Sequence, residues 1–181
     1  PDVMARYDTI QDFLDDLVKV EDELTAPDPE ATVDPSIAGH GERLEGGFTV
    51  VERKVGGSSS HVLLVREDGA QEDLILKVAR DLAHNDRLVA EGEVLSGLRH
   101  QNIVEYRRTL TVAGRTALLM RSAGSKTLTK RIKEDGGRLS LDLLQRFGEE
   151  LIEVVNFLEE QGVAHRDLKP ENIGIRNTSS G

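Results

Sequence analysis

The sequence predicts an α+β fold, in which a small antiparallel β lobe with one crossing helix precedes a helical lobe. Three patterns predict it: five short runs rich in aliphatic and β-branched residues, one helical stretch between the third and fourth runs, and a long apolar stripe near the end. Strands and helices do not alternate regularly, which favours antiparallel pairing. We expect the second lobe to be only begun within these 181 residues.

Turn residues separate the predicted strands of the β lobe. Asp68-Gly69 and Ala113-Gly114 are typical of tight turns between neighbouring strands. The predicted strands cover residues 48–55, 61–66, 74–79, 104–112 and 116–121. A helix over about 86–98 falls between the third and the fourth. The pattern therefore predicts a five-stranded antiparallel sheet crossed by one helix.

One long amphipathic helix is predicted in the second lobe. Ser140 is a suitable N-cap, and Gly162 is a natural residue just beyond the C-terminus. The apolar stripe consists of Leu144, Phe147, Leu151, Val155 and Leu158. We expect this apolar side to be covered, for example by self-association.

Residues 1–26 predict an additional amphipathic helix. Asp8 or Thr9 would cap it, and Pro27 prevents its continuation. Its apolar face consists of Ile10, Phe13, Leu14, Leu17, Val20 and Leu24. The helix is either a brace packed on the β lobe or a docking element for another domain. We place a linker at 27–43, the β lobe at 44–121 and the partial helical lobe at 122–181.

Composition limits the partners of this chain. The formal net charge is −10, whereas nucleic acids and anionic membranes select clustered lysine and arginine. No apolar run approaches the roughly 20 residues of a membrane span. The chain has no cysteine, which excludes disulfides. We expect a cytoplasmic protein with no membrane partner and no direct nucleic-acid partner.

The most specific motif lies near the C-terminus. It reads His165-Arg166-Asp167-Leu168-Lys169-Pro170-Glu171-Asn172. This segment resembles the catalytic loop of eukaryotic-type Ser/Thr protein kinases, H-R-D-L-x-x-x-N. The resemblance implies that Asp167 accepts the proton of the substrate hydroxyl, that Lys169 contacts the transferring phosphate and that Asn172 holds Mg²⁺. The alternative interpretation is a charge-rich turn after a helix.

A lysine and a glutamate form the second motif. Lys77 lies inside the apolar run 74–79, where its ammonium needs an anion. Glu91 shares a helical stripe with Leu88 and Leu95 and therefore faces inward. The resemblance implies that Lys77 and Glu91 pair and grip the phosphates of ATP, and 99–104 resembles the segment after that helix in the family. An edge-strand charge is the alternative for Lys77.

The phosphate loop departs from the family pattern. Where kinases have G-x-G-x-x-G, the chain reads Gly56-Gly57-Ser58-Ser59-Ser60-His61, so only the first glycine is in register. The resemblance implies that Gly56, Gly57, Ser58 and Ser59 bind ATP, since small residues let backbone N–H groups approach phosphate. An ordinary hairpin turn is the alternative.

Adenine recognition is expected in the connector that follows the last strand. The resemblance places Met120 at the gatekeeper position and Ser122 and Ala123 in the hinge. Arg121 stands where the family often has glutamate. Hinge contacts use mostly backbone groups, so this difference is compatible with ATP binding. For Met120, a plain core role is the alternative.

Together the motifs resemble the N-lobe, αC helix and first part of the C-lobe of a Ser/Thr protein kinase that uses ATP and Mg²⁺ on a protein substrate. The D-F-G motif and activation loop would follow Gly181 in a larger parent with other domains, so we expect this segment alone to be inactive. A pseudokinase or nucleotide-sensing scaffold stays open as an alternative. A small-molecule phosphotransferase would typically read H-G-D. The Ser-rich loop, the acidic helix and Gly174 are similar to bacterial phage-defence kinases of the phage-growth-limitation and BREX type.

Overall fold

The computed structural model describes residues 9–10, 13–14, 17 and 32–176. The chain divides into two units, 1–31 and 32–181, which we describe separately. In the first unit, the described apolar residues Ile10 and Leu17 are helical and exposed. The rest of the predicted helix lies outside the described residues, so both of its interpretations stay open. The domain boundaries likewise stay predictions.

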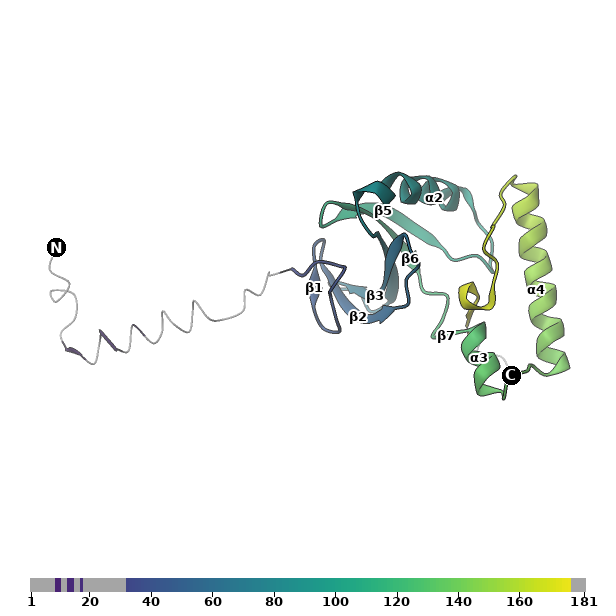
Figure 1. The fold of residues 1–181 in the computed structure, drawn as a ribbon, viewed down its shortest axis with the longest axis horizontal. Helices are drawn as coiled ribbons and strands as arrows, with labels where there is room; N and C mark the ends of the chain where they lie inside the picture. The colour runs from purple at the N-terminus through teal and green to yellow at the C-terminus, as the bar shows by residue number, and fades with distance from the viewer. Residues whose placement is uncertain (1–8, 11–12, 15–16, 18–31, 177–181) are drawn as a thin grey trace. The chain divides into compact units, whose positions relative to one another are not determined.

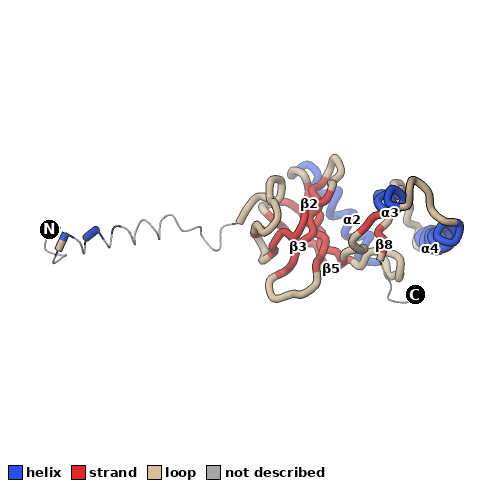
Figure 2. The backbone as a smooth tube through the Cα atoms, turned by 90° about the horizontal axis from the view of Figure 1, so that it is seen from below, coloured by secondary structure: helices blue, strands red, loops and turns tan. Residues whose placement is uncertain are grey.

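The second unit contains a six-stranded antiparallel sheet in the order β1-β2-β3-β4-β6-β5 (Figures 1 and 2). The strands are β1 (Arg43–Leu44), β2 (Phe48–Lys54), β3 (Ser60–Glu67), β4 (Asp73–Ala79), β5 (Tyr106–Val112) and β6 (Arg115–Arg121). The predicted antiparallel lobe is confirmed, with one strand more than expected. Strand β1 has only two residues, too few to show an alternating pattern.

The two helices that the sequence predicts after residue 44 are present in the predicted order, together with shorter elements. They are η2 (Leu82–His84), α2 (Asn85–Gly97), β7 (Lys126–Thr127), α3 (Leu128–Glu134), α4 (Leu141–Glu160), η3 (Pro170–Asn172) and β8 (Gly174–Ile175). Helix α2 packs on β5 and β6. Gly92 permits this contact, since a Cβ there would lie 2.7 Å from Thr109 Oγ1 and 2.8 Å from Leu118 Cδ2. The close packing holds α2 against the sheet.

The ends of α4 match the predicted caps. Ser140 Oγ accepts a hydrogen bond from the Leu143 N–H at 3.3 Å. At the other end Gly162 has φ +69°, and the Val163 N–H donates to Leu158 O at 2.8 Å. These are the features of a Schellman motif, in which a left-handed glycine lets the chain turn back on the last helical carbonyls. Among the described residues, no helix is long and apolar enough to span a membrane.

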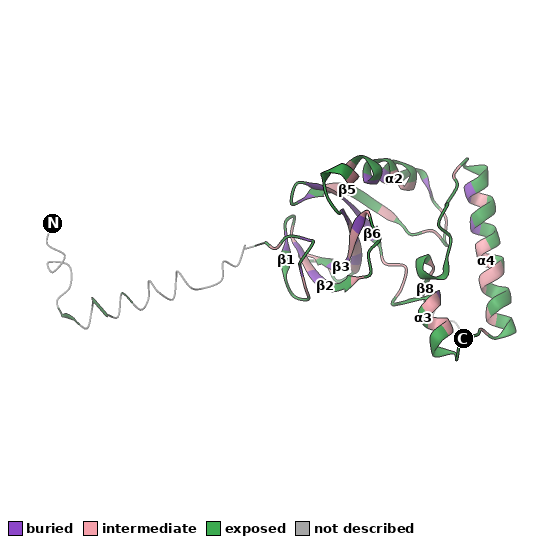
Figure 3. Cartoon of the chain, viewed as in Figure 1, coloured by how far each residue is buried: buried purple, intermediate pink, exposed green. Residues whose placement is uncertain are grey.

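Many of the buried residues of the second unit lie in the strands of the sheet (Figure 3). They form two clusters, one on each face. The paired residues Leu63, Leu76 and Leu119 lie on one face, in a core that also contains Leu44 and Ala38. The neighbouring row, Val62, Lys77 and Leu118, lies on the other face, where Leu118 packs with Leu88 of α2. Lys77 therefore points to the face that α2 covers.

Helix α4 is only partly covered. Val154 and Leu158 pack with Leu98 in a third cluster. Leu141 and Ile152 are exposed, by 77% and 62%. A surface pocket of ≈ 320 Å³ is lined by Leu151, Ile152, Val155, Asn156 and Leu168. Self-association through this face remains a prediction.

Residues 32–42, inside the predicted linker, pack on the sheet. Pro35 and Ala38 are fully buried. The guanidinium of Arg53 donates to Ala38 O at 3.2 Å and to Pro35 O at 2.6 Å. Arg115, whose side chain is 10% exposed, donates to both carboxylate oxygens of Asp34 at 2.7 Å. Two arginines thus fasten this segment to the β lobe.

An Asp34→Asn variant should be less stable at neutral pH by about 1–2 kcal/mol, because the Arg115 guanidinium loses its ionic partner. The loss stays in this range because the Asp34 side chain is half exposed and solvent screens the pair. Hydrogen bonds from Ser36, followed by those from Arg115, lower the pKa of Asp34 from 3.8 to about 2. A lowered folded-state pKa stabilises the protein above the unfolded value, and this contribution is lost as the pH falls from about 4 to about 2. Thermal unfolding between pH 2 and 7 measures it.

The matched control is Asp73→Asn, which removes a pair with the half-exposed Arg66. This control should lower stability by less than about 1 kcal/mol. The interpretation of Asp34 is wrong if Asp34→Asn keeps the acid dependence of the wild type between pH 4 and pH 2.

Candidate active site

Lys77 and Glu91 form a bidentate ion pair between β4 and α2. Lys77 Nζ lies 2.6 Å from Glu91 Oε1 and 2.7 Å from Oε2. The side chains are 23% and 35% exposed. The spacing of α2 directs Glu91 toward the sheet, one turn from the fully buried Leu88. The structure thus brings together the two residues that the sequence pairs, and leaves the lysine accessible from one side.

In the segment 165–172, two polar side chains surround one carboxylate. Lys169 Nζ lies 2.9 Å from Asp167 Oδ1. Asn172 Nδ2 donates to Asp167 Oδ2 and to Asp167 O, each at 2.9 Å. Arg166, with φ +60°, makes the left-handed turn that closes this arrangement. The hydrogen bonds from Lys169 and then Asn172 lower the pKa of Asp167, so its carboxylate is ionised at neutral pH.

Asn172 offers an oxygen that is suited to a hard cation. Both bonds to Asp167 use its amide nitrogen, and none of the described residues donates a hydrogen bond to Oδ1. Within the same part of the chain, no three His, Cys, Asp or Glu side chains form a metal-ligand cluster. Mg²⁺ commonly takes one or two protein oxygens and completes its shell with substrate phosphates and water. The residues present fit a site of that kind.

The phosphate loop between β2 and β3 is held by an arginine that the sequence analysis missed. Arg80 Nη2 donates to Gly57 O at 3.1 Å, and the Arg80 N–H donates to Ser59 O at 3.0 Å. At Gly56 a Cβ would lie 2.5 Å from Ser60 O, so glycine is required there. The first glycine is thus kept for a close backbone approach, while Arg80 fastens the rest of the loop. No periodic pattern marks this arginine, which simply follows an apolar strand.

An Arg80→Ala variant should bind nucleotide about tenfold more weakly, because one hydrogen bond from a charged donor to Gly57 O is lost. Backbone amides of 56–60 should also exchange faster with solvent. Titration with a fluorescent ATP analogue and hydrogen–deuterium exchange measure the two effects. Arg87→Ala, at an exposed position of α2, is the control. Equal affinities in both variants would remove the role assigned to Arg80.

A surface pocket lies where the sheet meets the hinge. Its volume is ≈ 240 Å³, and its lining consists of Glu52, Lys54, Leu64, Asp73, Ser122, Gly124 and Ser125. Lys54 pairs across the strands with Val62, which in turn pairs with Lys77, so the pocket and the ion pair share one face of the sheet. Ser122 lines the pocket, whereas Met120 is 8% exposed and packs in the core with Leu88. Ala123 is not among the lining residues.

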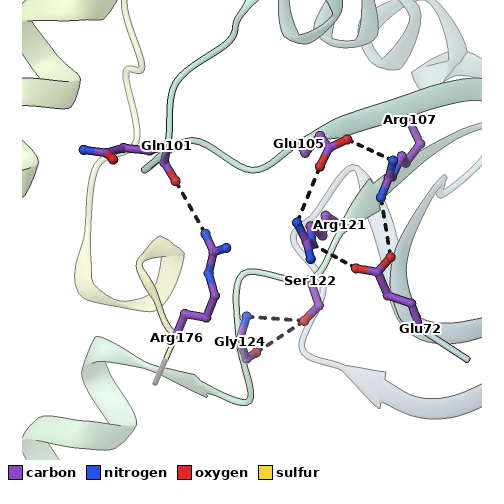
Figure 4. A network of polar contacts seen from close by, with 8 residues as sticks. All are labelled: Glu72, Gln101, Glu105, Arg107, Arg121, Ser122, Gly124 and Arg176. Atoms are coloured by element: carbon purple, nitrogen blue, oxygen red, sulfur yellow. Dashed lines mark hydrogen bonds and ion pairs between the residues drawn. The ribbon is translucent and has the colours of Figure 1, made fainter. Parts of the chain in front are cut away.

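A ring of charges holds the start of the hinge to the β lobe (Figure 4). Arg121 Nε donates to Glu72 Oε1 at 2.8 Å, and Arg121 Nη1 lies 3.8 Å from Glu105 Oε2. Arg107 closes the ring with Glu105 at 2.9 Å and Glu72 at 3.4 Å. Beyond the ring, Ser122 Oγ lies 3.4 Å from the Gly124 nitrogen. The arginine at 121 therefore has two acidic partners in the β lobe.

The chain that follows the segment 165–172 pairs directly with the end of the predicted hinge. In the β7–β8 pairing, Lys126 lies opposite Ile175 and Thr127 opposite Gly174. The Leu128 N–H donates to Ile173 O at 2.8 Å. The hinge, the pocket beside it and the carboxylate of Asp167 thus belong to one connected arrangement.

Comparisons with known proteins agree with this geometry. Residues 49–180 match the family model described as protein kinase domain. The probable kinase PglW of Streptomyces coelicolor is 31% identical over 94% of this chain and 13% of its own length. Calcium/calmodulin-dependent protein kinase type IV of Mus musculus is 31% identical over 71% of this chain and 27% of its own length. A serine/threonine-protein kinase of equine herpesvirus 1 is 26% identical over 72% of this chain and 33% of its own length. The chain thus spans a third or less of these relatives, and it belongs to the protein kinase domain family.

Proposed function

We propose that the protein carrying this chain transfers the γ-phosphoryl group of ATP to serine and threonine hydroxyls of other proteins. The observation that carries the proposal is the combination of a Lys77–Glu91 pair with an Asp167 carboxylate held by Lys169 and Asn172. Phosphoryl transfer needs charge stabilisation and orientation more than covalent help from the protein, and these residue types supply both.

Each residue has a distinct task in this reaction. Asp167 orients the acceptor hydroxyl and takes its proton, while the bond from the hydroxyl oxygen to the γ-phosphorus forms and ADP leaves with the electrons of the broken bond. Lys169 neutralises charge on the transferring group. Lys77, oriented by Glu91, binds phosphate oxygens of the nucleotide. The pocket at the hinge receives the base.

Mg²⁺, when bound, neutralises phosphate charge during the transfer. The free Oδ1 of Asn172 is the oxygen within this chain that would hold it. The hydrogen bonds from the amide nitrogen to Asp167 fix the direction of that oxygen. Preference for serine and threonine is supported by the lysine two residues after Asp167 and by the similarity to a serine/threonine-protein kinase of equine herpesvirus 1.

The parent protein belongs to this proposal as well. The similarity to PglW covers 94% of this chain but 13% of that relative, which supports a larger parent with further domains. Membership of the phage-defence kinases, and a cytoplasmic location, are part of the same proposal. For the segment 1–181 alone we expect no phosphotransfer, since the D-F-G aspartate and the substrate platform are not among its residues.

A pseudokinase is the second candidate. It is favoured by the phosphate loop, where Ser58 and His61 replace the second and third glycines. Burial, and then the charges of Arg80 and Arg53, lower the pKa of His61, so this side chain adds little positive charge beside the loop. Against this candidate, the Lys77, Asp167 and Asn172 side chains retain the types that catalysis needs.

The deciding experiment incubates the parent protein with γ-labelled ATP, Mg²⁺ and a mixed protein substrate, followed by phosphoamino-acid analysis. An Asp167→Ala variant serves as the blank. Labelled phosphoserine or phosphothreonine supports the proposal. Nucleotide binding without any transfer identifies a pseudokinase, and label only on small molecules identifies a metabolite phosphotransferase. Transfer by residues 1–181 alone would refute the expected inactivity of the segment.

A further inference from the structure

Two glycines lie at the contact between the hinge and the segment that follows the catalytic loop. Gly124, with φ +121°, approaches so closely that a Cβ would meet Ile175 O and would lie 2.7 Å from Ile175 C. At Gly174 a Cβ would meet the Ala123 Cβ and would lie 2.7 Å from Ala123 O. Ordinary contacts between such atoms begin near 3.5 Å. Any side chain at either position would therefore separate the two backbones by on the order of 1 Å.

The hydrogen bonds around this contact transmit such a displacement to the catalytic carboxylate. Gly174 lies opposite Thr127 in the β7–β8 pairing. Two residues earlier in the chain, the Asn172 N–H donates to Lys169 O at 2.9 Å, and the Asn172 side chain holds Asp167. A shift at Gly174 is thus carried through Asn172 to Asp167.

The hinge side of the contact is the better fastened of the two. Arg121 holds the start of the hinge through the charge ring with Glu72 and Glu105 (Figure 4). Its backbone N–H also donates to Glu105 O at 2.8 Å. Beyond β8, by contrast, Arg176 Nη2 reaches Gln101 O at the long distance of 3.4 Å. Because the hinge is held by the sheet, a forced separation displaces the catalytic segment more than the hinge.

We propose that Gly124 and Gly174 form a spacing contact that sets the position of the catalytic loop relative to the nucleotide pocket. They are positioning residues, since neither supplies a reacting group. The inference rests on the proposed phosphoryl transfer and deepens it. It also explains why glycine follows Asn172-Ile173 in this chain: the space for a side chain at position 174 is occupied by Ala123.

The test compares Gly174→Ala with Gly148→Ala in the parent protein. Gly148 lies in α4, and a Cβ there would have no neighbour within 4 Å. We expect Gly174→Ala to lower kcat about 100-fold, because a 1 Å misplacement of reacting groups costs about that factor, while the Kd of a fluorescent ATP analogue changes less than about threefold. Gly148→Ala should retain wild-type kcat. The double variant Ala123→Gly/Gly174→Ala, which removes the clashing methyl, should regain part of the lost kcat.

Two results would overturn the spacing role. They are a kcat of Gly174→Ala within about threefold of the wild type, and parallel losses of kcat, nucleotide affinity and melting temperature. If the wild type transfers no phosphate at all, the proposed function fails. Hydrogen–deuterium exchange of 165–176 then tests whether the glycine contact still positions this segment. Faster exchange in Gly174→Ala than in Gly148→Ala supports the contact, and equal exchange overturns it.

Discussion

An Asp167→Asn variant of the parent protein should lose phosphotransfer by about 10³-fold, in the range expected for removal of a general base. The amide has the shape of the carboxylate, so its oxygen still accepts from Lys169, which lies 2.9 Å from Asp167 in the wild type. Its NH2 group cannot accept from Asn172 Nδ2 as Asp167 Oδ2 does, but the bond from Asn172 Nδ2 to the backbone oxygen of residue 167 remains. The loop should therefore keep most of its contacts while the proton acceptor is lost. Single-turnover transfer of labelled phosphate measures the effect, and a melting temperature close to that of the wild type shows that folding is unchanged.

The pH dependence of the wild type separates this role from a purely structural one. Hydrogen bonds from Lys169 and then Asn172 lower the pKa of Asp167. A lowered pKa means that the carboxylate stays ionised throughout the neutral and mildly acidic range. Protonation of Asp167 should therefore cause no loss of kcat/KM between pH 8 and pH 5. Lys169→Met should move the acid limb of the pH–rate profile to higher pH, because it removes the hydrogen bond that contributes most to stabilising the ionised Asp167 carboxylate. An acid limb that does not move in Lys169→Met would contradict this assignment.

The parts of the fold that depend on local periodicity were predictable from the sequence. Strand β3 contains the continuous apolar run 62–65, and buried residues alternate with less buried ones along most of β4. Helix α4 combines an apolar stripe with two recognisable caps. The five predicted strands and the two predicted helices of the second unit begin and end within about two residues of the expected positions, whereas β1, β7 and α3 were not predicted. The Lys77–Glu91 contact was predictable for the same reason, since residues three and four apart share a helix face.

Contacts between residues far apart in the chain were not predictable in this way. The pairing of Asp34 with Arg115 spans 81 positions, and no local pattern links the two. The three prolines in 27–43 predicted a linker, although Pro35 is fully buried against the sheet. The spacing of hydrophobic residues reports which side of an element is buried, but not which distant segment covers it. Arg80 on the phosphate loop was missed for the same reason.

Substitution of Lys77 by methionine should lower kcat/KM of the parent protein about 10²- to 10³-fold, comparable to the loss of a preorganised charge in an active site. Lys77 Nζ is held at 2.6 Å and 2.7 Å by the two oxygens of Glu91. A methionine side chain keeps most of the length of the lysine side chain but lacks its charge. Glu91→Gln should have a smaller effect, because the lysine remains. Steady-state kinetics with varied ATP measures both. Lys133→Met, at an exposed position of α3, is the control.

The exchanged pair Lys77→Glu/Glu91→Lys distinguishes a phosphate grip from a structural ion pair. If the two side chains only join β4 to α2, exchanging them restores the attraction, and both stability and activity should return. If Lys77 binds phosphate, stability returns but activity does not, because the ammonium now extends from α2 and a carboxylate extends from the strand beside the nucleotide. We expect the second result. Recovery of both properties in the exchanged pair would show that Lys77 acts on the fold alone.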